Sequence, residues 1–288
     1  MNGILYAKLN LIDYKYISYN FFTIGPYLRF EKSKRKYSSF FIFNTNLLQI
    51  FFILCFFYLI PKKYLIYNPT NNNINQNSIN IFLFNKPAHW SDYFFILNNH
   101  RKLVIELFFN ILTDEIKNKF YELATPYIGV HIRRGDFLEF RSDDHFRYNG
   151  NTKTPDFYFI DLINSIRKYT NLIIPVKLFS DGYNAELHNI LSLENIEHIE
   201  NNNDMLDLLH LSKSQLIITS AGSTFSYWAA FLSNATVLIH KDHIHKDLRD
   251  NITNSIYYEG PYLDPSCNSL LKSNLDMLAK NYKEKTYE

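Results

Sequence analysis

The sequence has little glycine and almost no cysteine, and each shortage excludes a class of site. Only 8 of the 288 residues are glycine, and no stretch has the GxxxxGK[S/T] or GxGxxG spacing. That spacing lets a backbone wrap around phosphates in NTPases and dinucleotide enzymes. The two cysteines, Cys55 and Cys267, stand far apart without the spacing of a zinc site. A disulfide framework is therefore not expected, which favours a reducing compartment.

A strong excess of one charge is also lacking. The formal net charge of +2 gives no broad basic surface of the kind that nucleic acids attract, so no nucleic-acid partner is expected. No DxD pair stands at the end of a predicted strand, so we expect no metal. A hydrophobic content of 47% with 20% charged residues is typical of a folded protein, and the length suffices for one large domain or two lobes.

An uncharged run of 25 residues, from Tyr37 to Pro61, lies between basic residues. Only its second half, Ile50 to Ile60, is continuously apolar, and these 11 residues are too few for a bilayer, which needs about 20. Two interpretations stay open: a helix that is buried or lies on a membrane surface, or a true membrane anchor. The chain is therefore expected to be cytoplasmic or membrane-associated. A signal peptide is not favoured, because the apolar run starts late.

Residues 1–125 are expected to form an N-terminal lobe. An Asn-rich stretch, Asn68 to Asn80, is typical of a loop or linker, and the apolar residues 81–84 after it predict a short strand. From Asp92 to Ala124 the apolar residues recur at helical spacing, which predicts one or two helices.

Residues 126–288 are expected to form a second domain with a parallel, Rossmann-like sheet. Between Tyr127 and His240, short apolar stretches alternate with segments of helical periodicity, which is typical of such a sheet. The predicted strands are 127–132, 175–180, 196–199, 215–220 and 235–240, and the predicted helices are 155–170, 184–192, 204–214 and 225–233.

The first of these strands ends in two arginines. Its apolar residues alternate with His131 and Arg133, so one face of the strand is apolar and the other is reactive, and Arg134 follows where the chain leaves the sheet. Two guanidiniums cannot be buried without partners. We expect Asp136 to neutralise one and an anion such as phosphate to bind the other. A structural arginine–aspartate network without a ligand is the alternative.

Two further loops leave strand ends, which meet at one edge of a parallel sheet. Asp181 directly follows a strand, where it either accepts hydrogen bonds from a base or ribose or caps the next helix. After another strand, Gly222 allows a tight turn, and the hydroxyls of Ser223, Thr224 and Ser226 stand where a helix begins. Hydroxyls and free backbone N–H groups at a helix N-terminus form an anion site, although an ordinary N-cap needs only one hydroxyl.

Together the three loops predict a diphosphate-bearing nucleotide at the carboxyl edge of the sheet. Charge-assisted hydrogen bonds contribute about 1.5–3 kcal/mol each, so two or three would hold a diphosphate at micromolar strength. Base and ribose contacts would add selectivity. Without a metal, the arginines and the helix dipole would balance the charge of the diphosphate.

At these residues the sequence resembles the α-1,2-fucosyltransferases of glycosyltransferase family 11, within the group that shares an HxRRxD signature. HIRRGDF at 131–137 matches that signature, FSDG at 179–182 resembles the second block of the family, and 204–232 resembles its third block, with a Ser/Thr-rich turn and a Trp-Ala pair. Three blocks in the right order make the resemblance specific.

The resemblance implies a two-lobed GT-B-like fold whose C-terminal lobe is the Rossmann-like sheet. It implies GDP-fucose as donor and a glycan acceptor, with transfer to a galactoside hydroxyl in an α-1,2 linkage, with inversion and without a metal. The donor-binding residues that it implies are His131, Arg133, Arg134, Asp136, Asp181, Ser223, Thr224, Phe225 and Ser226.

An inverting transfer needs a base that takes the proton of the acceptor hydroxyl. Glu139, Asp143 and Asp144 follow the signature, and Glu139 ranks first because it is nearest to the strand end. Assistance by the departing phosphate is the alternative. We assign catalytic roles to Arg133 and Glu139.

One feature of the family does not appear. Its members usually open with a glycine-rich strand loop similar to GGLGNQ, whereas only Gly3 and Gly25 precede Gly129 here. The N-terminal lobe is therefore expected to be reduced or divergent. Two alternatives to fucosyl transfer stay open: a transferase that uses another nucleotide sugar, and an inactive remnant that still binds nucleotide.

Overall fold

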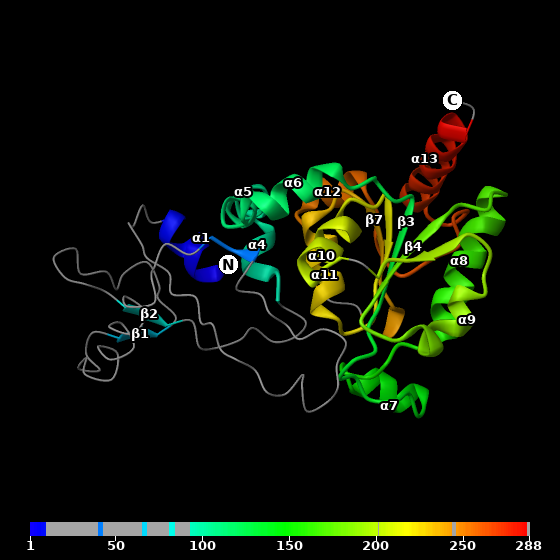
Figure 1. Ribbon diagram of the computed structural model, residues 1–288, viewed down its shortest axis with the longest axis horizontal. Helices are drawn as coiled ribbons and strands as arrows, with labels where there is room; N and C mark the ends of the chain where they lie inside the picture. Colours follow the sequence, from blue (N-terminus) through cyan, green and yellow to red (C-terminus); the bar gives the residue numbers. More distant parts are fainter. Residues whose placement is uncertain are drawn as a thin grey trace.

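A six-stranded, entirely parallel sheet carries the fold (Figure 1). The computed structural model describes residues 1–9, 40–42, 65–67, 81–83, 93–200, 202–243 and 246–286. The strand order is β5-β4-β3-β6-β7-β8. The chain places β4 and β5 on one side of β3, and then β6, β7 and β8 on its other side. The described strands are β1 Leu65–Tyr67, β2 Ile81–Leu83, β3 Ile128–Ile132, β4 Val176–Ser180, β5 Ile196–His198, β6 Leu216–Ile218, β7 Thr236–Leu238 and β8 Glu259–Gly260.

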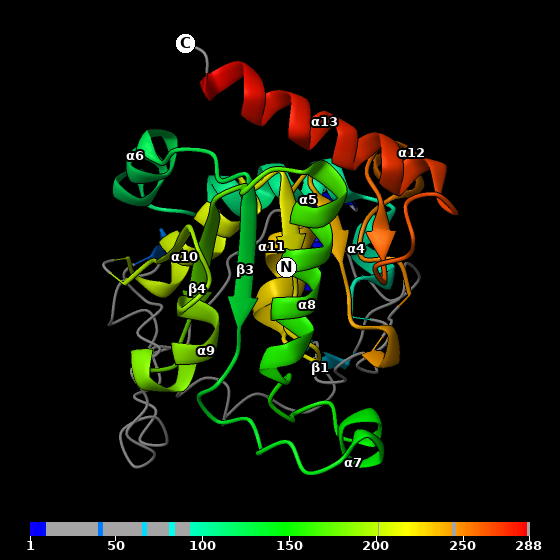
Figure 2. The same ribbon diagram turned by 90° about the vertical axis from the view of Figure 1, so that its right-hand side faces the viewer.

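Helices cover both faces of this sheet, so the expected α/β fold with a Rossmann-like parallel sheet is confirmed (Figures 1 and 2). The helices predicted between the strands are present, the second of them as a 3₁₀ turn that continues into α9. The described helices are α1 Asn2–Leu9, α4 Phe95–Asn98, α5 Arg101–Asn110, α6 Asp114–Glu122, α7 Asp143–Tyr148, α8 Asp156–Thr170, η4 Asn184–Leu187, α9 His188–Leu191, α10 Asp204–Ser212, α11 Thr224–Leu232, η5 Lys241–His243, α12 Asn251–Ile256 and α13 Ser269–Thr286.

The two faces of β3 are buried in different ways. Ile128, Val130 and Ile132 are fully buried in a core that they share with α8, α9 and α13. On the other face, a Cβ at Gly129 would lie 2.2 Å from Oγ of Ser214, so the end of α10 lies directly on the strand. Burial on both faces is the reason that the strands contain long apolar stretches.

The region before β3 contains three helices rather than the one or two expected. Thr113 is extended and separates α5 from α6, because the chain there pairs with residues 40–42: Thr113 donates to the carbonyl of Phe40 at 3.0 Å. Phe94, the N-cap residue of α4, packs against α11 together with Leu97 from α4 and Val104 from α5. Residues 93–125 therefore contact the sheet domain, and the division at residue 125 stays a prediction.

Several features predicted for the N-terminal part lie outside the described residues. The short strand after the linker is confirmed as β2, which pairs in parallel with β1. The Asn-rich linker 68–80 is outside the described residues, as is most of the run 37–61, of which the structure describes residues 40–42. Across the described ranges, none of the helices combines the length and the apolar character needed to cross a membrane.

A buried ion pair connects β8, the last strand, to the chain before α12. The side chains of Arg249 and Glu259 are 0% and 5% exposed, with Nε 2.9 Å from Oε2. Arg249 also donates to the carbonyls of Ala235 and Tyr257, and Glu259 accepts from the backbone N–H of Leu248. Because a buried charge without a partner is strongly destabilising, each member of this pair requires the other.

Glu259→Gln is therefore expected to lower the free energy of unfolding by about 3 kcal/mol, since it removes the carboxylate in direct contact with the buried Arg249 guanidinium. Urea denaturation followed by far-ultraviolet circular dichroism measures this change. The matched control is Glu284→Gln, which removes an exposed partner of Lys280 and should change stability by less than about 0.5 kcal/mol. Equal effects of the two substitutions would contradict the role given to the buried pair.

Candidate functional site

Two of the three predicted loops meet where the strand order reverses, between β3 and β6. In an open parallel sheet, ligands bind beyond the carboxyl ends of the strands at such a reversal. The backbone N–H of Arg133, just after β3, donates to Oγ of Ser220, just after β6, at 3.0 Å. Figure 2 shows β3 pointing toward α7, with α13 at the other end of the sheet, so the candidate site lies at the α7 end.

Arg133 lies at this edge with a side chain that is 20% exposed. Its guanidinium contacts two carboxylates, Asp136 Oδ1 and Asp181 Oδ2, each at 2.5 Å. It also lies 5.7 Å from the centre of the Phe137 ring. These contacts hold the guanidinium in a fixed direction before any ligand binds.

Arg134 points into the protein instead. Its side chain is 6% exposed, forms an ion pair with Asp156 and donates from Nη1 to the carbonyl of Thr154 at 2.9 Å. Its backbone N–H donates to Oδ1 of Asp181 at 2.7 Å. The expectation that one of the two arginines would need an external anion is therefore not met in this structure, because each guanidinium already has a carboxylate.

Asp181 brings the second loop into the site as a partner of both arginines. One carboxylate oxygen contacts the side chain of Arg133 and the other accepts from the backbone of Arg134. The close approach requires glycine at position 135, where a Cβ would lie 2.3 Å from Oδ2 of Asp181. The carboxylate does not cap the next helix, since η4 begins after Tyr183.

His131 and Ser226 lie inside the protein, beneath the site. Nδ1 of His131 is 2.7 Å from Oγ of Ser226, and its ring stacks on Phe225 with centroids 4.6 Å apart. Burial, and after it the charge of Arg133, lower the pKa of His131 to about 3, so the ring is neutral at physiological pH. Ser226 Oγ also accepts from the N–H of Ser220 at 3.2 Å. The hydroxyl of Ser226 is therefore used within the protein and does not line the edge.

The turn between β6 and α11 uses most of its own N–H groups. Gly222 donates to the buried hydroxyl of Tyr227 at 2.8 Å, and Ser223 donates to the carbonyl of Ser220. Ser223 is the N-cap residue of α11, without a side-chain capping bond, and Thr224 is exposed. Among the residues that the structure describes, the N–H groups of 224–226, the first turn of α11, have no hydrogen-bond partner. These groups are available to an anion.

The candidate base Glu139 lies in the connection between β3 and α8. Its side chain is 76% exposed, and a carboxylate oxygen is 2.5 Å from Nζ of Lys153. Asp143 and Asp144 are exposed in the first turn of α7. His243 holds this helix in place, with Nε2 2.9 Å from the carbonyl oxygen of Phe146.

Two residues at the site were not anticipated. In the sequence, Asp156 stands at the start of the predicted helix 155–170, and Ser220 is the last residue of the predicted strand 215–220. The acidic residue after Pro155 gave no sign that it pairs with an arginine 22 positions earlier. The run of hydroxyls after β6 did indicate polar contacts there, although not that Ser220 reaches the backbone of Arg133.

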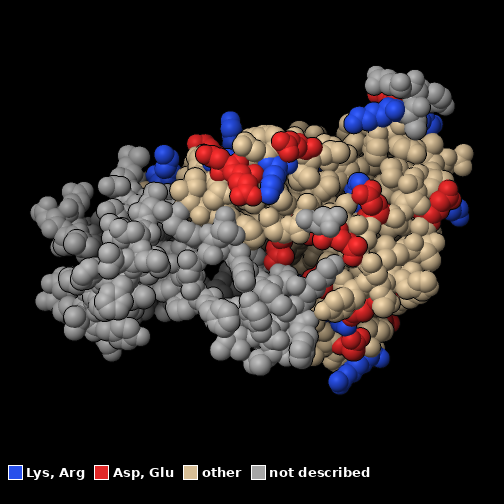
Figure 3. All heavy atoms as spheres, viewed as in Figure 1, with Lys and Arg blue, Asp and Glu red and all other residues tan. Residues whose placement is uncertain are grey.

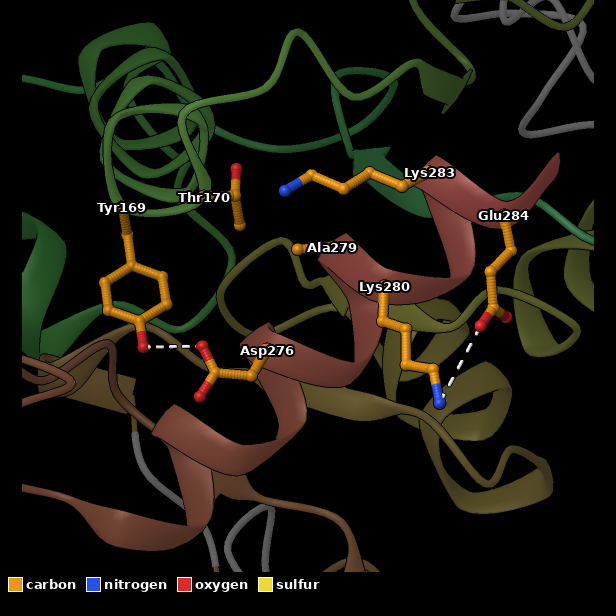
Figure 4. A pocket seen from close by; sticks show the side chains of 7 residues that line it. All are labelled: Tyr169, Thr170, Asp276, Ala279, Lys280, Lys283 and Glu284. Carbon is orange, nitrogen blue, oxygen red and sulfur yellow. Dashed lines mark hydrogen bonds and ion pairs between the residues drawn. The ribbon is translucent and has the colours of Figure 1, made fainter. Parts of the chain in front are cut away.

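Other surfaces differ from this edge in character. A groove lined by Tyr169, Lys280, Lys283 and neighbouring residues lies between the last turn of α8 and α13 (Figure 4), far along α8 from the strand ends. On the described part of the face in Figure 3, acidic and basic side chains are interspersed.

The sequence of this chain matches the model of a known family, glycosyl transferase family 11, over residues 4–259. The chain belongs to this family. The resemblance seen at the three blocks is thereby confirmed. No curated protein sequence matches the chain significantly.

Solved structures with some similarity to this family 11 chain include sugar-nucleotide enzymes. POFUT1 in complex with GDP is 15% identical, covers 48% of this chain and 46% of its own, and has a TM-score of 0.29. NodZ alpha-1,6-fucosyltransferase soaked with GDP-fucose is 18% identical, with 47% of each chain covered and a TM-score of 0.29. A UDP-GlcNAc 2-epimerase from Methanocaldococcus jannaschii is 11% identical, covers 96% of this chain and 65% of its own, and has a TM-score of 0.35.

The alignments with POFUT1 and NodZ span less than half the length of those proteins. TM-scores of this size do not define a common fold. The GT-B-like arrangement of two lobes therefore stays an expectation for the N-terminal part of the chain, whereas the parallel sheet is observed directly.

Gly222→Ala is expected to destabilise the turn before α11 by more than about 1–2 kcal/mol. Gly222 has φ +68°, in the left-handed region, and a Cβ there would lie 1.7 Å from the carbonyl oxygen of Gly150. The control is Gly150→Ala, because a Cβ at that glycine meets nothing within 4 Å. Thermal unfolding compares the two variants. A variant at 222 as stable as that at 150 would contradict the close approach of the two loops.

The pH dependence of stability tests the burial of His131. This imidazole protonates at about pH 3 in the folded chain, but at about 6.5 when unfolded, so unfolding takes up a proton between these values. The free energy of unfolding should fall as the pH drops below about 6.5, with His131 contributing about 1.4 kcal/mol per pH unit.

His131→Gln should therefore flatten the dependence, measured by urea denaturation between about pH 4.5 and about pH 7. The exposed His188→Gln is the control and should keep the slope of the native chain. A His131 variant with an unchanged slope would show that the imidazole is not buried in neutral form.

Proposed function

We propose that this chain is a fucosyltransferase that moves L-fucose from GDP-fucose to a galactoside hydroxyl. The proposal includes an α-1,2 linkage, inversion at the anomeric carbon and no requirement for a metal. Membership of glycosyl transferase family 11 supports the glycosyl transfer. The linkage, the inversion and the acceptor are extensions from the HxRRxD signature at 131–136.

The proposal is carried by the position of Arg133. This residue lies between β3 and β6, where the strand order reverses, and next to the turn that leads into α11. A guanidinium offers two parallel donors to a phosphate, and the first turn of a helix offers N–H groups and the positive end of its dipole. Arg133 is joined to this turn through Ser220. A diphosphate at this edge can contact the guanidinium and the N–H groups of residues 224–226.

A diphosphate would have to replace a carboxylate on Arg133. Asp136 is the better candidate for release, because its side chain is 32% exposed and that of Asp181 is 15% exposed. Asp181 is also held by the backbone N–H of Arg134. In this proposal Asp136 exchanges with the phosphate, while Asp181 and the buried Arg134 keep the loop in place.

In the reaction, the oxygen of the acceptor hydroxyl attacks the anomeric carbon of fucose from the face opposite the diphosphate. The bond from that carbon to the phosphate oxygen breaks, and GDP leaves with the electron pair. Arg133 and the N-terminus of α11 stabilise the negative charge that develops on the leaving group. The hydroxyl proton passes to Glu139, which must leave Lys153, or to the departing phosphate.

Neutral His131 has a supporting role in this proposal. A charged imidazole would add a cation below Arg133, whereas the neutral ring accepts from or donates to Ser226 and fixes the start of α11. Two alternatives remain in view: a donor with another nucleotide or sugar, and a chain that binds nucleotide without turning over. The glycine-poor N-terminal part keeps the second alternative open.

The first test measures GDP binding. At a concentration of 100 times its Kd, GDP should stabilise the chain by about 2.7 kcal/mol, which raises Tm by several degrees. Arg133→Lys should keep a charge beside Asp136 and Asp181 but lose the two-pronged contact, and so weaken GDP binding about tenfold or more. Lys280→Ala, on α13, is the matched control and should bind GDP as the native chain does.

No stabilisation of the native chain by GDP would overturn the proposal. A second test measures turnover with GDP-fucose, other GDP-sugars and UDP-sugars, each with a β-galactoside acceptor. NMR of the product gives the linkage and the anomeric configuration. Product from GDP-fucose alone, with inverted configuration, is the expected result. Turnover of a different donor would favour the first alternative, and GDP binding without turnover of any donor would favour the second.

A further inference from the structure

The residue before Pro155 is buried at the centre of the contacts around Arg133 and Arg134. Thr154 is 0% exposed and precedes Pro155, the N-cap residue of α8. Its carbonyl accepts from Nη1 of Arg134, and Asp156, two residues later, forms the ion pair with the same guanidinium. The backbone at Thr154 is thus tied to the loop after β3.

The hydroxyl of Thr154 is tied to a different element, the turn after β6. Oγ1 accepts from the backbone N–H of Ala221 at 2.9 Å and is 3.4 Å from Oγ of Ser220. Ser220 Oγ in turn accepts from the backbone N–H of Arg133 at 3.0 Å. A single side chain therefore connects the start of α8, the turn that leads into α11 and the backbone of the arginine that faces the edge.

The N–H of Ala221 makes this contact important. This N–H is buried in the turn and would have no hydrogen-bond acceptor without the Thr154 oxygen. The chain would then lose the full desolvation free energy of the N–H group. The turn would have to shift to reach another acceptor. Because α11 begins three residues later, such a shift would change the direction of the N–H groups at 224–226 relative to Arg133.

We propose that Thr154 is a positioning residue of the donor site, which aligns the N-terminus of α11 with Arg133 through its hydroxyl. This role rests on the proposed function, since it assigns Thr154 to the binding of the GDP diphosphate. The side chain itself lies below the edge and touches no phosphate. It acts through Ala221 and Ser220.

The chain offers a matched control two residues earlier. Thr152 is 1% exposed, in the same connection between β3 and α8, and its Oγ1 has no hydrogen-bond partner among the residues that the structure describes. Replacing either threonine with valine removes one hydroxyl and keeps the shape of the side chain. Only at Thr154 does the change remove a hydrogen bond from the turn.

Thr154→Val, Thr154→Ser and Thr152→Val are compared by isothermal titration with GDP, well below the Tm of each variant. Thr154→Val should raise the Kd for GDP about tenfold or more, while Thr154→Ser should restore native affinity to within about threefold. Thr152→Val should bind as the native chain does. Hydrogen exchange at residues 219–226, without GDP, should become faster in Thr154→Val and stay unchanged in Thr152→Val.

Native affinity in a folded Thr154→Val, or an equal loss in both valine variants, would overturn the role of the Thr154 hydroxyl while leaving the proposed function intact. A native chain that does not bind GDP overturns the proposed function and with it this role. If Thr154→Val does not fold, Ser220→Ala replaces it, because it removes the hydroxyl between Thr154 and the N–H of Arg133. Native GDP affinity in Ser220→Ala would then count against the proposal.

Discussion

The ion pair between Arg134 and Asp156 is the interaction on which the arrangement of the site depends. A guanidinium this deeply buried needs a counter-charge inside the protein, and Asp156, the first residue of α8, supplies it. The pair fixes the start of α8 against the loop that follows β3. With Arg134 held inside, the adjacent Arg133 is left at the edge between β3 and β6. Two neighbouring residues of the same type thereby acquire different functions.

The sequence allowed the sheet to be predicted because its central strands β3, β6 and β7 are buried on both faces. Long apolar stretches that alternate with helical segments leave few arrangements other than a parallel sheet, and the ends of its strands must then share an edge. The direction of a side chain beyond a strand end was not predictable in this way. After Ile132 the chain leaves the sheet, so alternation no longer determines which way Arg134 points. The partner that decides it, Asp156, comes from the next helix.

The hydroxyls after β6 illustrate the same limit. Ser223, Thr224 and Ser226 are close in sequence and were expected to act together on an anion. Once the segment becomes helical, successive side chains point in different directions around the axis. Ser226 turns inward to His131, whereas Thr224 is exposed. The clustering of hydroxyls in the sequence thus identified the turn between β6 and α11 as part of the site. The helical geometry of α11 nevertheless points these hydroxyls in different directions.

The balance of charge at the edge determines how an anion can bind there. Arg133 and Arg134 face three carboxylates, those of Asp136, Asp156 and Asp181. The two guanidiniums are therefore already neutralised, and a diphosphate gains little from them unless it displaces one of these carboxylates. Neutral amide donors carry no such counter-charge, so the first turn of α11 has to provide much of the net attraction. The accuracy with which that turn is positioned should then matter as much as the arginine itself.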